Sequence, residues 1–125
     1  MAKLYCQITG IVLLVAGVLG LFWSGVSGFL SINEPAEIGL HLVLGALSTY
    51  AGFSGGGYGR LALLYARLFG IVYLALAVAG FARPDLLPGV LHLDLGCNIL
   101  HLVLAIWGIW AGYLARQPSA AAPAR

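Results

Sequence analysis

Most of the chain consists of four apolar runs, separated by short segments rich in glycine, serine, proline and charged residues. The runs cover Leu4–Trp23, Ala36–Phe53, Leu61–Ala82 and Cys97–Leu114. A helix of about 20 residues rises about 30 Å, which matches the hydrocarbon thickness of a bilayer. The pattern therefore predicts an all-α membrane protein with four transmembrane helices. The second run is short for a span and should cross nearly upright or start in the headgroup layer.

The connecting segments carry turn residues. Ser24–Pro35 is predicted as a loop from its Gly, Ser and Pro content, and Arg83–Gly89 breaks the third helix. Ser54–Arg60 is a glycine-rich connector. Asn33 and Asn98 precede or open the even-numbered helices, and we expect them to cap those helices.

The chain contains an internal repeat. Leu40–Leu44 (Leu-His-Leu-Val-Leu) returns sixty residues later as Leu100–Leu104, and fifteen of the fifty positions from 4 to 53 are identical at that offset. We predict one transmembrane domain, residues 1–116, with repeat one at about 4–53 and repeat two at about 64–113. A Pro/Ala-rich cytoplasmic tail follows at 117–125. Because each repeat holds two spans, the repeats are parallel, related by a pseudo-two-fold axis along the membrane normal.

Composition supports a membrane location. The chain is 62% hydrophobic and 8% charged, against about 25% charged for an average soluble domain. So few charges cannot cover a water-exposed surface, and we therefore expect the lipid bilayer as solvent. The net charge of +2 is too small and too scattered for a nucleic-acid surface.

The charged residues predict an orientation. With four spans, the N-terminus, the central connector and the tail share one side of the membrane, and five of the six basic residues fall there: Lys3, Arg60, Arg67, Arg116 and Arg125. The acidic residues fall on the other side: Glu34, Glu37, Asp85 and Asp94. Positive charge marks the cytoplasmic side, so both termini should be cytoplasmic.

Small residues recur at helical spacing and predict the faces on which helices pack. They are Ala16, Gly20, Gly45, Ser48, Gly52, Gly108 and Gly112. Gly108-x-x-x-Gly112 is a small-xxx-small pattern, which allows close helix contact in membranes. His41 shares its face with Gly45, Ser48 and Gly52, and His101 stands at the equivalent place in repeat two. Both histidines should therefore face other helices.

His41 and His101 are the candidate cofactor-binding residues. One hypothesis is that they bind a haem iron, a chlorophyll magnesium or a zinc ion. The favoured one is that each imidazole hydrogen-bonds to a neighbouring helix or loop. His92, Asp94 and Glu37 match no metal-ligand spacing, so no metal site is expected. No nucleophile–base–acid arrangement is present, so we do not expect an enzyme.

Two stretches resemble a known family. Arg67–Gly80, followed by Cys97–Leu104, resembles a widespread bacterial family of uncharacterised four-helix membrane proteins, in which an Asn or Asp stands shortly before Leu-His-Leu in each half. Asn98 and His101 match that motif, as does His41, whereas Glu37 and Ile38 replace an Asp–Asn pair. The resemblance implies the four-helix fold and the bacterial cytoplasmic membrane. It implies no activity.

Three functions remain open on the sequence. The favoured one is a non-catalytic accessory subunit without a cofactor, packed against a larger respiratory or photosynthetic membrane complex. The second is a haem- or (bacterio)chlorophyll-binding protein with His41 and His101 as axial ligands. The third is a small transporter or membrane-redox enzyme that works as an oligomer, for which a homo-oligomer is one possible assembly. The expected partners are thus lipid and membrane proteins.

Overall fold

The structure is a computed structural model that describes residues 1–23, 25–26, 30–54, 59–91 and 93–116. The predicted tail at 117–125, His92 and parts of both predicted connectors lie outside the described residues. The elements, in chain order, are α1 (Ala2–Gly20), β1 (Gly25–Val26), β2 (Leu30–Ser31), α2 (Pro35–Phe53), α3 (Arg60–Ala82), α4 (Leu95–Ile109) and the π-helical turn η2 (Trp110–Leu114).

The four predicted helices are confirmed, and α1, α2 and α3 begin and end within three residues of their expected bounds. The fourth begins two residues early and ends as α-helix at Ile109, after which the π-helical turn η2 continues to the expected end at Leu114. Pro35 opens α2, where its fixed φ suits the first turn and its missing N–H costs nothing. The segment between α1 and α2 was expected to be a plain loop, but β1 and β2 pair antiparallel within it, with Gly25 opposite Ser31. The expected caps at Asn33 and Asn98 are both wrong, since Glu34 is the N-cap of α2. Asp94 is the N-cap of α4, and Asn98 lies inside the helix.

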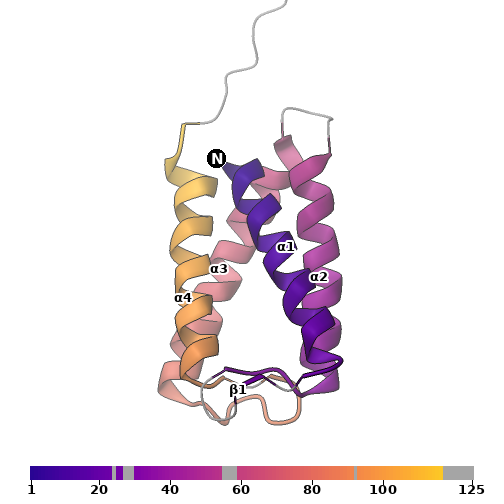
Figure 1. Cartoon of the computed structure of the whole chain (residues 1–125). Helices are drawn as coiled ribbons and strands as arrows, with labels where there is room; N and C mark the ends of the chain where they lie inside the picture. The colour runs from indigo at the N-terminus through magenta and orange to yellow at the C-terminus, as the bar shows by residue number, and fades with distance from the viewer. Residues whose placement is uncertain (24, 27–29, 55–58, 92, 117–125) are drawn as a thin grey trace, which may run out of the picture.

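The helices form two antiparallel hairpins, α1 with α2 and α3 with α4 (Figure 1). The N-terminus and the C-terminal end of α4 lie at the same end of the bundle, and the strands lie at the opposite end. At the N-terminal end the Sγ of Cys6 donates to the carbonyl of Ala62 over 3.4 Å, which links α1 to α3. In Figure 1, α1 and α4 meet near that end and diverge toward the strands.

Glycines set the distance between the helices of each hairpin, and they do so at equivalent positions. A Cβ on Gly10 would lie 2.5 Å from the backbone nitrogen of Thr49, and a Cβ on Gly70 would lie 2.8 Å from that of Ile109. Thr49 and Ile109 are themselves sixty residues apart. Backbones can approach this closely only where no side chain intervenes.

A second pair of contacts repeats at the same offset. Nε2 of Gln7 donates to the carbonyl of Gly52 over 3.0 Å, and Nε of Arg67 donates to the carbonyl of Gly112 over 2.8 Å. These bonds satisfy carbonyls near helix C-termini, which lack partners within the helix. The two hairpins therefore use equivalent contacts, even where the residue type differs.

The core at the N-terminal end, here called the sealed end, consists of four residue pairs sixty positions apart. They are Ala2 and Ala62, Tyr5 and Tyr65, Cys6 and Ala66, and Ala51 and Ala111. Each of the eight is buried. The hydroxyl of Tyr65 crosses to the carbonyl of Leu44 on α2 over 3.2 Å, while the ring of Tyr5 meets Trp107 on α4 edge to face.

The outer surface is apolar. Three helical segments are long and apolar enough to cross a membrane, namely Ala2–Gly20, Arg60–Ala82 and Leu95–Leu114. Large apolar side chains cover their outward faces, including Val15, Leu68, Val78 and Ile106. This arrangement indicates a multi-pass membrane protein, because hydrocarbon and not water is the solvent that such a surface suits.

Candidate functional site

Away from the sealed end, the helices part around a cavity of about 440 Å³, here called the lateral cleft. All four helices contribute to its walls, and its mouth lies between α1 and α4, where the lining residues are about half exposed: Ile11, Val15, Leu19, Leu100 and Val103. The volume falls within the range of small-molecule sites. Because the mouth lies between two outward helix faces, the cleft opens sideways onto the apolar surface.

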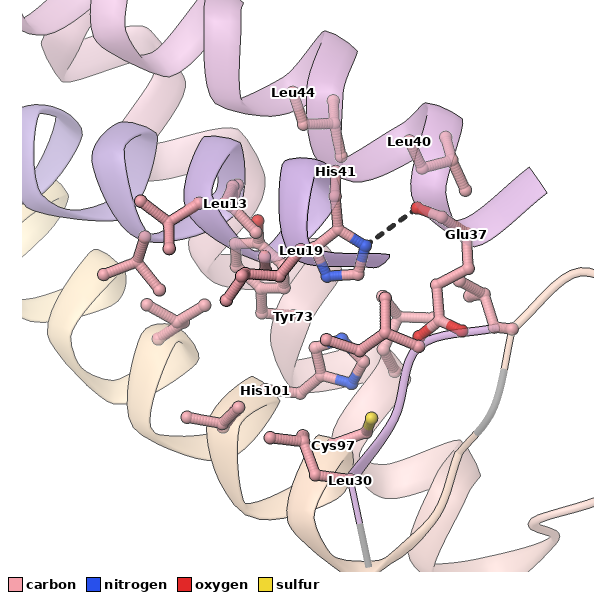
Figure 2. A pocket seen from close by; sticks show the side chains of 18 of the residues that line it. Leu13, Leu19, Leu30, Glu37, Leu40, His41, Leu44, Tyr73, Cys97 and His101 are labelled. Atoms are coloured by element: carbon pink, nitrogen blue, oxygen red, sulfur yellow. Dashed lines mark hydrogen bonds between the residues drawn. The ribbon is translucent and has the colours of Figure 1, made fainter. Parts of the chain in front are cut away.

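The inner end of the cleft carries its polar groups. Glu37 and His41 come from α2, Tyr73 from α3, and Cys97 and His101 from α4. Figure 2 shows both imidazole rings and the carboxyl group of Glu37 pointing into the same space. The histidines predicted from the repeat thus meet at one site, at the same depth in the two hairpins. The walls around them are aliphatic.

His41 is held in one orientation by its own helix. Its Nδ1 lies 2.8 Å from the carbonyl oxygen of Glu37, one turn earlier. A carbonyl only accepts, so Nδ1 is the donor, and the Nε2 of the neutral ring is then an acceptor. The bond lies within α2 and does not reach the neighbouring helix or loop that the sequence analysis expected, and it leaves Nε2 available to the cleft.

His101 is oriented differently, because a tyrosine stands beside it. Its ring stacks on Tyr73 with 5.7 Å between centroids and 19° between planes, and its buried Nδ1 has no hydrogen-bond partner in the described structure. The residue equivalent to Tyr73 in repeat one is Leu13. The hydrogen-bonding partner expected for His101 is therefore not among the described residues.

The stack on His101 continues along α3. Tyr65, Phe69 and Tyr73 are spaced four apart and share one helix face, with centroid distances of 4.3 Å and 6.2 Å between neighbours. Tyr73 is 3% exposed. This row joins the sealed end to the cleft, so the position of the His101 ring depends on packing in both parts.

The strand end of the cleft is covered by β2, which Asp94 links to the start of α4; this arrangement is here called the clasp. Asp94 accepts two backbone hydrogen bonds, from Cys97 N over 3.0 Å and from Ser31 N over 2.7 Å. The first caps α4, and the second ties β2 to the start of that helix. Leu30 and Ile32, on either side of Ser31, line the cleft. Asp94 thus fixes the segment that closes this end.

Charge is divided between the two ends. Lys3 at the sealed end donates to the carbonyl of Ser54 over 3.2 Å, and the guanidinium of Arg67 lies 5.2 Å from the ring centre of Tyr113. No lysine or arginine is among the residues that line the cleft. Glu37, which is 2% exposed, lies in the first turn of α2, where the helix dipole favours negative charge.

The small residues predicted for packing lie mostly between helices. Gly45 faces Leu14, Gly52 faces Gln7, Gly108 faces Gly70, and Gly112 faces Arg67. The hydroxyl of Ser48 donates to the carbonyl of Cys6 over 2.9 Å, and Gly20 faces Ile32 and Ile38. Ala16 differs from the others, because it lies on the wall of the cleft.

Sequence reasoning missed Tyr73 and underused Glu37. The four-residue spacing of Tyr65, Phe69 and Tyr73 was a visible signal of an aromatic face. Glu37 was considered with His92 and Asp94 as a metal-ligand set and rejected, although it stands one turn before His41. Among the described residues, no group of three or more His, Cys, Asp or Glu side chains is arranged to hold a metal ion.

Comparison with protein-family models, with curated proteins and with solved structures finds no match for this chain. The resemblance to the bacterial four-helix family therefore stays a prediction, and the function has to be argued from the cleft itself.

Proposed function

We propose that this chain is a non-catalytic protein of the bacterial cytoplasmic membrane, which crosses the bilayer four times and holds a small lipid-soluble molecule in the lateral cleft. The observation that carries the proposal is the form of the cleft. It opens sideways between α1 and α4, has aliphatic walls, and ends on His41, His101 and Glu37. An apolar pocket with a few convergent polar groups is the usual form of a small-molecule site.

The outward face of α2 supports a fourth span. Its polar residues Glu37 and Ser48 are buried, while Leu40, Val43, Leu47, Tyr50 and Phe53 are exposed on the other face. The mean hydropathy of the whole helix does not show this division between a buried polar face and an exposed apolar face. The 19 residues of α2 rise about 28 Å, and α2 lies along α1, so it should cross the bilayer wherever α1 does.

The division of charge supports the predicted orientation. Lys3, Arg60, Arg67 and Arg116 belong to the end at which the N-terminus lies, and the acidic residues belong to the strand end. By the positive-inside rule, the sealed end is cytoplasmic and the lateral cleft lies in the outer half of the membrane. Both termini are then cytoplasmic, and the two hairpins are parallel repeats.

We retain the accessory role expected from the sequence. Val103 lines both the cleft and a shallow apolar depression on α4 and η2, which it shares with Ile106, Trp107 and Trp110. A transmembrane helix of a larger complex that packed over this depression would also cover the mouth of the cleft. The bound molecule would then lie at the boundary between this subunit and its partner.

A second candidate is the binding of haem or (bacterio)chlorophyll, which the geometry of His41 favours. Metal-ligating histidines commonly donate their other ring nitrogen to a backbone carbonyl, and His41 Nδ1 makes such a bond with Glu37. On this alternative the purified protein would be coloured, and His41→Ala would remove the colour.

The test is a gentle-detergent purification of the full chain, followed by an absorption spectrum and mass spectrometry of the extracted small molecules. We expect a colourless protein that carries one lipid-soluble compound. The compound should be lost from Val103→Trp, which fills the mouth, and retained by Val43→Trp. Val43 is the repeat equivalent of Val103, is 58% exposed and does not line the cleft. Equal retention by both variants would contradict the proposal.

A further inference from the structure

We propose that the molecule in the lateral cleft is an isoprenoid quinol, with its dihydroxy ring between His41 and His101 and its tail leaving between α1 and α4. This inference rests on the proposed function, since it names the chemical class that the same cleft would hold. It follows from three properties of the cleft: the hydrogen bonds its inner end can make, its charge, and its open side.

The inner end can accept hydrogen bonds from a ligand. Because Nδ1 of His41 donates to a carbonyl, Nε2 of the neutral imidazole is an acceptor. Nδ1 of His101 is buried and without a partner in the described structure. The two rings come from α2 and α4 and point into the same space (Figure 2). A ring with hydroxyl groups on opposite sides can donate to one imidazole at each side.

The charge of the cleft excludes an anionic head group. A phosphate or a fatty-acid carboxylate needs cationic or several N–H donors, but none of the described residues that line the cleft is a lysine or arginine, and Glu37 lies at its inner end. A permanent cation would have to leave water for aliphatic walls, which carries a large desolvation cost. A neutral head with hydroxyl groups carries neither penalty.

The open side of the cleft fits a long apolar tail. Val15 and Val103 stand at the mouth and are 52% and 53% exposed. A volume of about 440 Å³ holds a substituted ring and the first part of a chain, and the rest can run along the outer surface among lipid tails. The flat faces of Tyr73 and of the two imidazoles suit an aromatic ring.

The test uses a decyl-tailed ubiquinol, kept reduced under argon, with the purified full chain in nanodiscs. Trp23 lines the cleft, so binding should quench its fluorescence, and Trp23→Phe should remove that signal. We expect His41→Leu and His101→Leu each to weaken binding about tenfold, because each leaves one ligand hydroxyl buried without an acceptor. The dimethyl ether of the same quinol, which has no hydroxyl donor, should bind the unaltered protein at least tenfold more weakly.

Control variants separate binding from folding. Val78→Leu, on the outward face of α3, should bind as the unaltered protein does, and His41→Gln should recover part of the affinity because its amide oxygen accepts. Equal binding of the quinol and its ether would overturn the assignment of the ring. If tetraphenylphosphonium competes with the quinol, and if its binding depends on Glu37, the cleft binds a cationic ligand and the quinol assignment is wrong.

The experiments distinguish a wrong assignment of the ligand class from a wrong assignment of the cleft as a binding site. If the quinol does not bind, but a co-purified compound is lost from Val103→Trp and kept by Val43→Trp, the cleft binds a molecule of another class. If neither the quinol nor any co-purified compound responds to Val103→Trp, the proposed function itself is wrong.

Discussion

The sealed end and the lateral cleft are built from the same two repeats, yet they differ in how closely the repeats agree. At the sealed end the buried residues pair as Ala with Ala and Tyr with Tyr at an offset of sixty, with Cys6 and Ala66 the one difference. Around the cleft Leu40, His41 and Leu44 recur as Leu100, His101 and Leu104, but the other pairs of equivalent lining residues differ between the repeats. At the offset of sixty residues, Leu13 corresponds to Tyr73, and Glu37 corresponds to Cys97.

This difference reflects two requirements, one for the packing of a symmetric core and one for the binding of a ligand. A pseudo-two-fold core needs equal residues at equal positions, because side chains of both hairpins meet near the axis and must interlock. A ligand without that symmetry needs different neighbours on its two sides. The cleft has an acidic group and a fixed imidazole on one side, and an aromatic ring with a stacked imidazole on the other.

The largest effect should come from the glycines at the helix crossings. We expect Gly10→Ala and Gly70→Ala each to lower the free energy of unfolding by about 2–3 kcal/mol, since the added methyl group overlaps backbone atoms that cannot move aside. Thermal unfolding in detergent, followed by circular dichroism, measures both. If the hairpins are equivalent, the two costs should agree within about 1 kcal/mol.

Gly39→Ala is the matched control on α2. Nothing lies within 4 Å of a Cβ at Gly39, so the change should stabilise the helix by about 0.5–1 kcal/mol through reduced backbone freedom in the unfolded chain. A large cost at Gly10 with none at Gly70 would show that the hairpins do not share one packing geometry.

A smaller effect is expected at the clasp. Asp94→Asn replaces an oxygen that accepts a backbone N–H with an amide that cannot accept at both positions. The loss should be about 1–2 kcal/mol, concentrated at β2 and the start of α4. Hydrogen exchange should rise at Ser31 and Leu30 and stay unchanged at the sealed end. Asp85→Asn, in the exposed turn after α3, should change neither.

Much of the fold followed from the sequence, because the relevant signals are local. Four apolar runs and a repeat offset predict four helices and their pairing, and the expected ends of α2 and α3 are each within one residue of the structure. The two short strands and the Asp94 cap were not predicted. Strands of two residues leave no periodic pattern, and a cap depends on which of several nearby polar residues reaches the free N–H groups.

The candidate site was predicted only in part, because a cleft depends on the angle between helices. The repeat placed His41 and His101 at the same depth, but no sequence pattern showed that α1 and α4 diverge beside them. Ala16 was expected to pack against a helix and lies on the cleft wall instead. The role of Tyr73 follows from its distance to His101, which sequence spacing does not contain.

Tyr73→Leu makes repeat two resemble repeat one beside its histidine. The change removes the stack on His101, which is worth about 1 kcal/mol of stability, and leaves that ring without a fixed orientation. Quinol affinity should fall about threefold to tenfold, measured by quenching of Trp23. Tyr113→Leu, the same change on the exposed face of η2, should leave the affinity unchanged. An unaltered affinity in Tyr73→Leu would mean that the asymmetry of the cleft is unrelated to its ligand.

The smallest effect is expected at the sealed end, at the position occupied by Gln7 in repeat one and Arg67 in repeat two. The residue types differ there, but the hydrogen bonds are equivalent. Arg67→Gln places in repeat two the residue that repeat one has, and Gln7 already makes the equivalent bond to Gly52. The variant should keep the bond to the Gly112 carbonyl and lose only the contact with Tyr113, which is worth about 0.5–1 kcal/mol. Arg67→Leu has no donor and should lose about 1 kcal/mol more. If both variants unfold at the same temperature, the bond to Gly112 contributes nothing, and the equivalence of the two hairpins at this position is one of sequence alone.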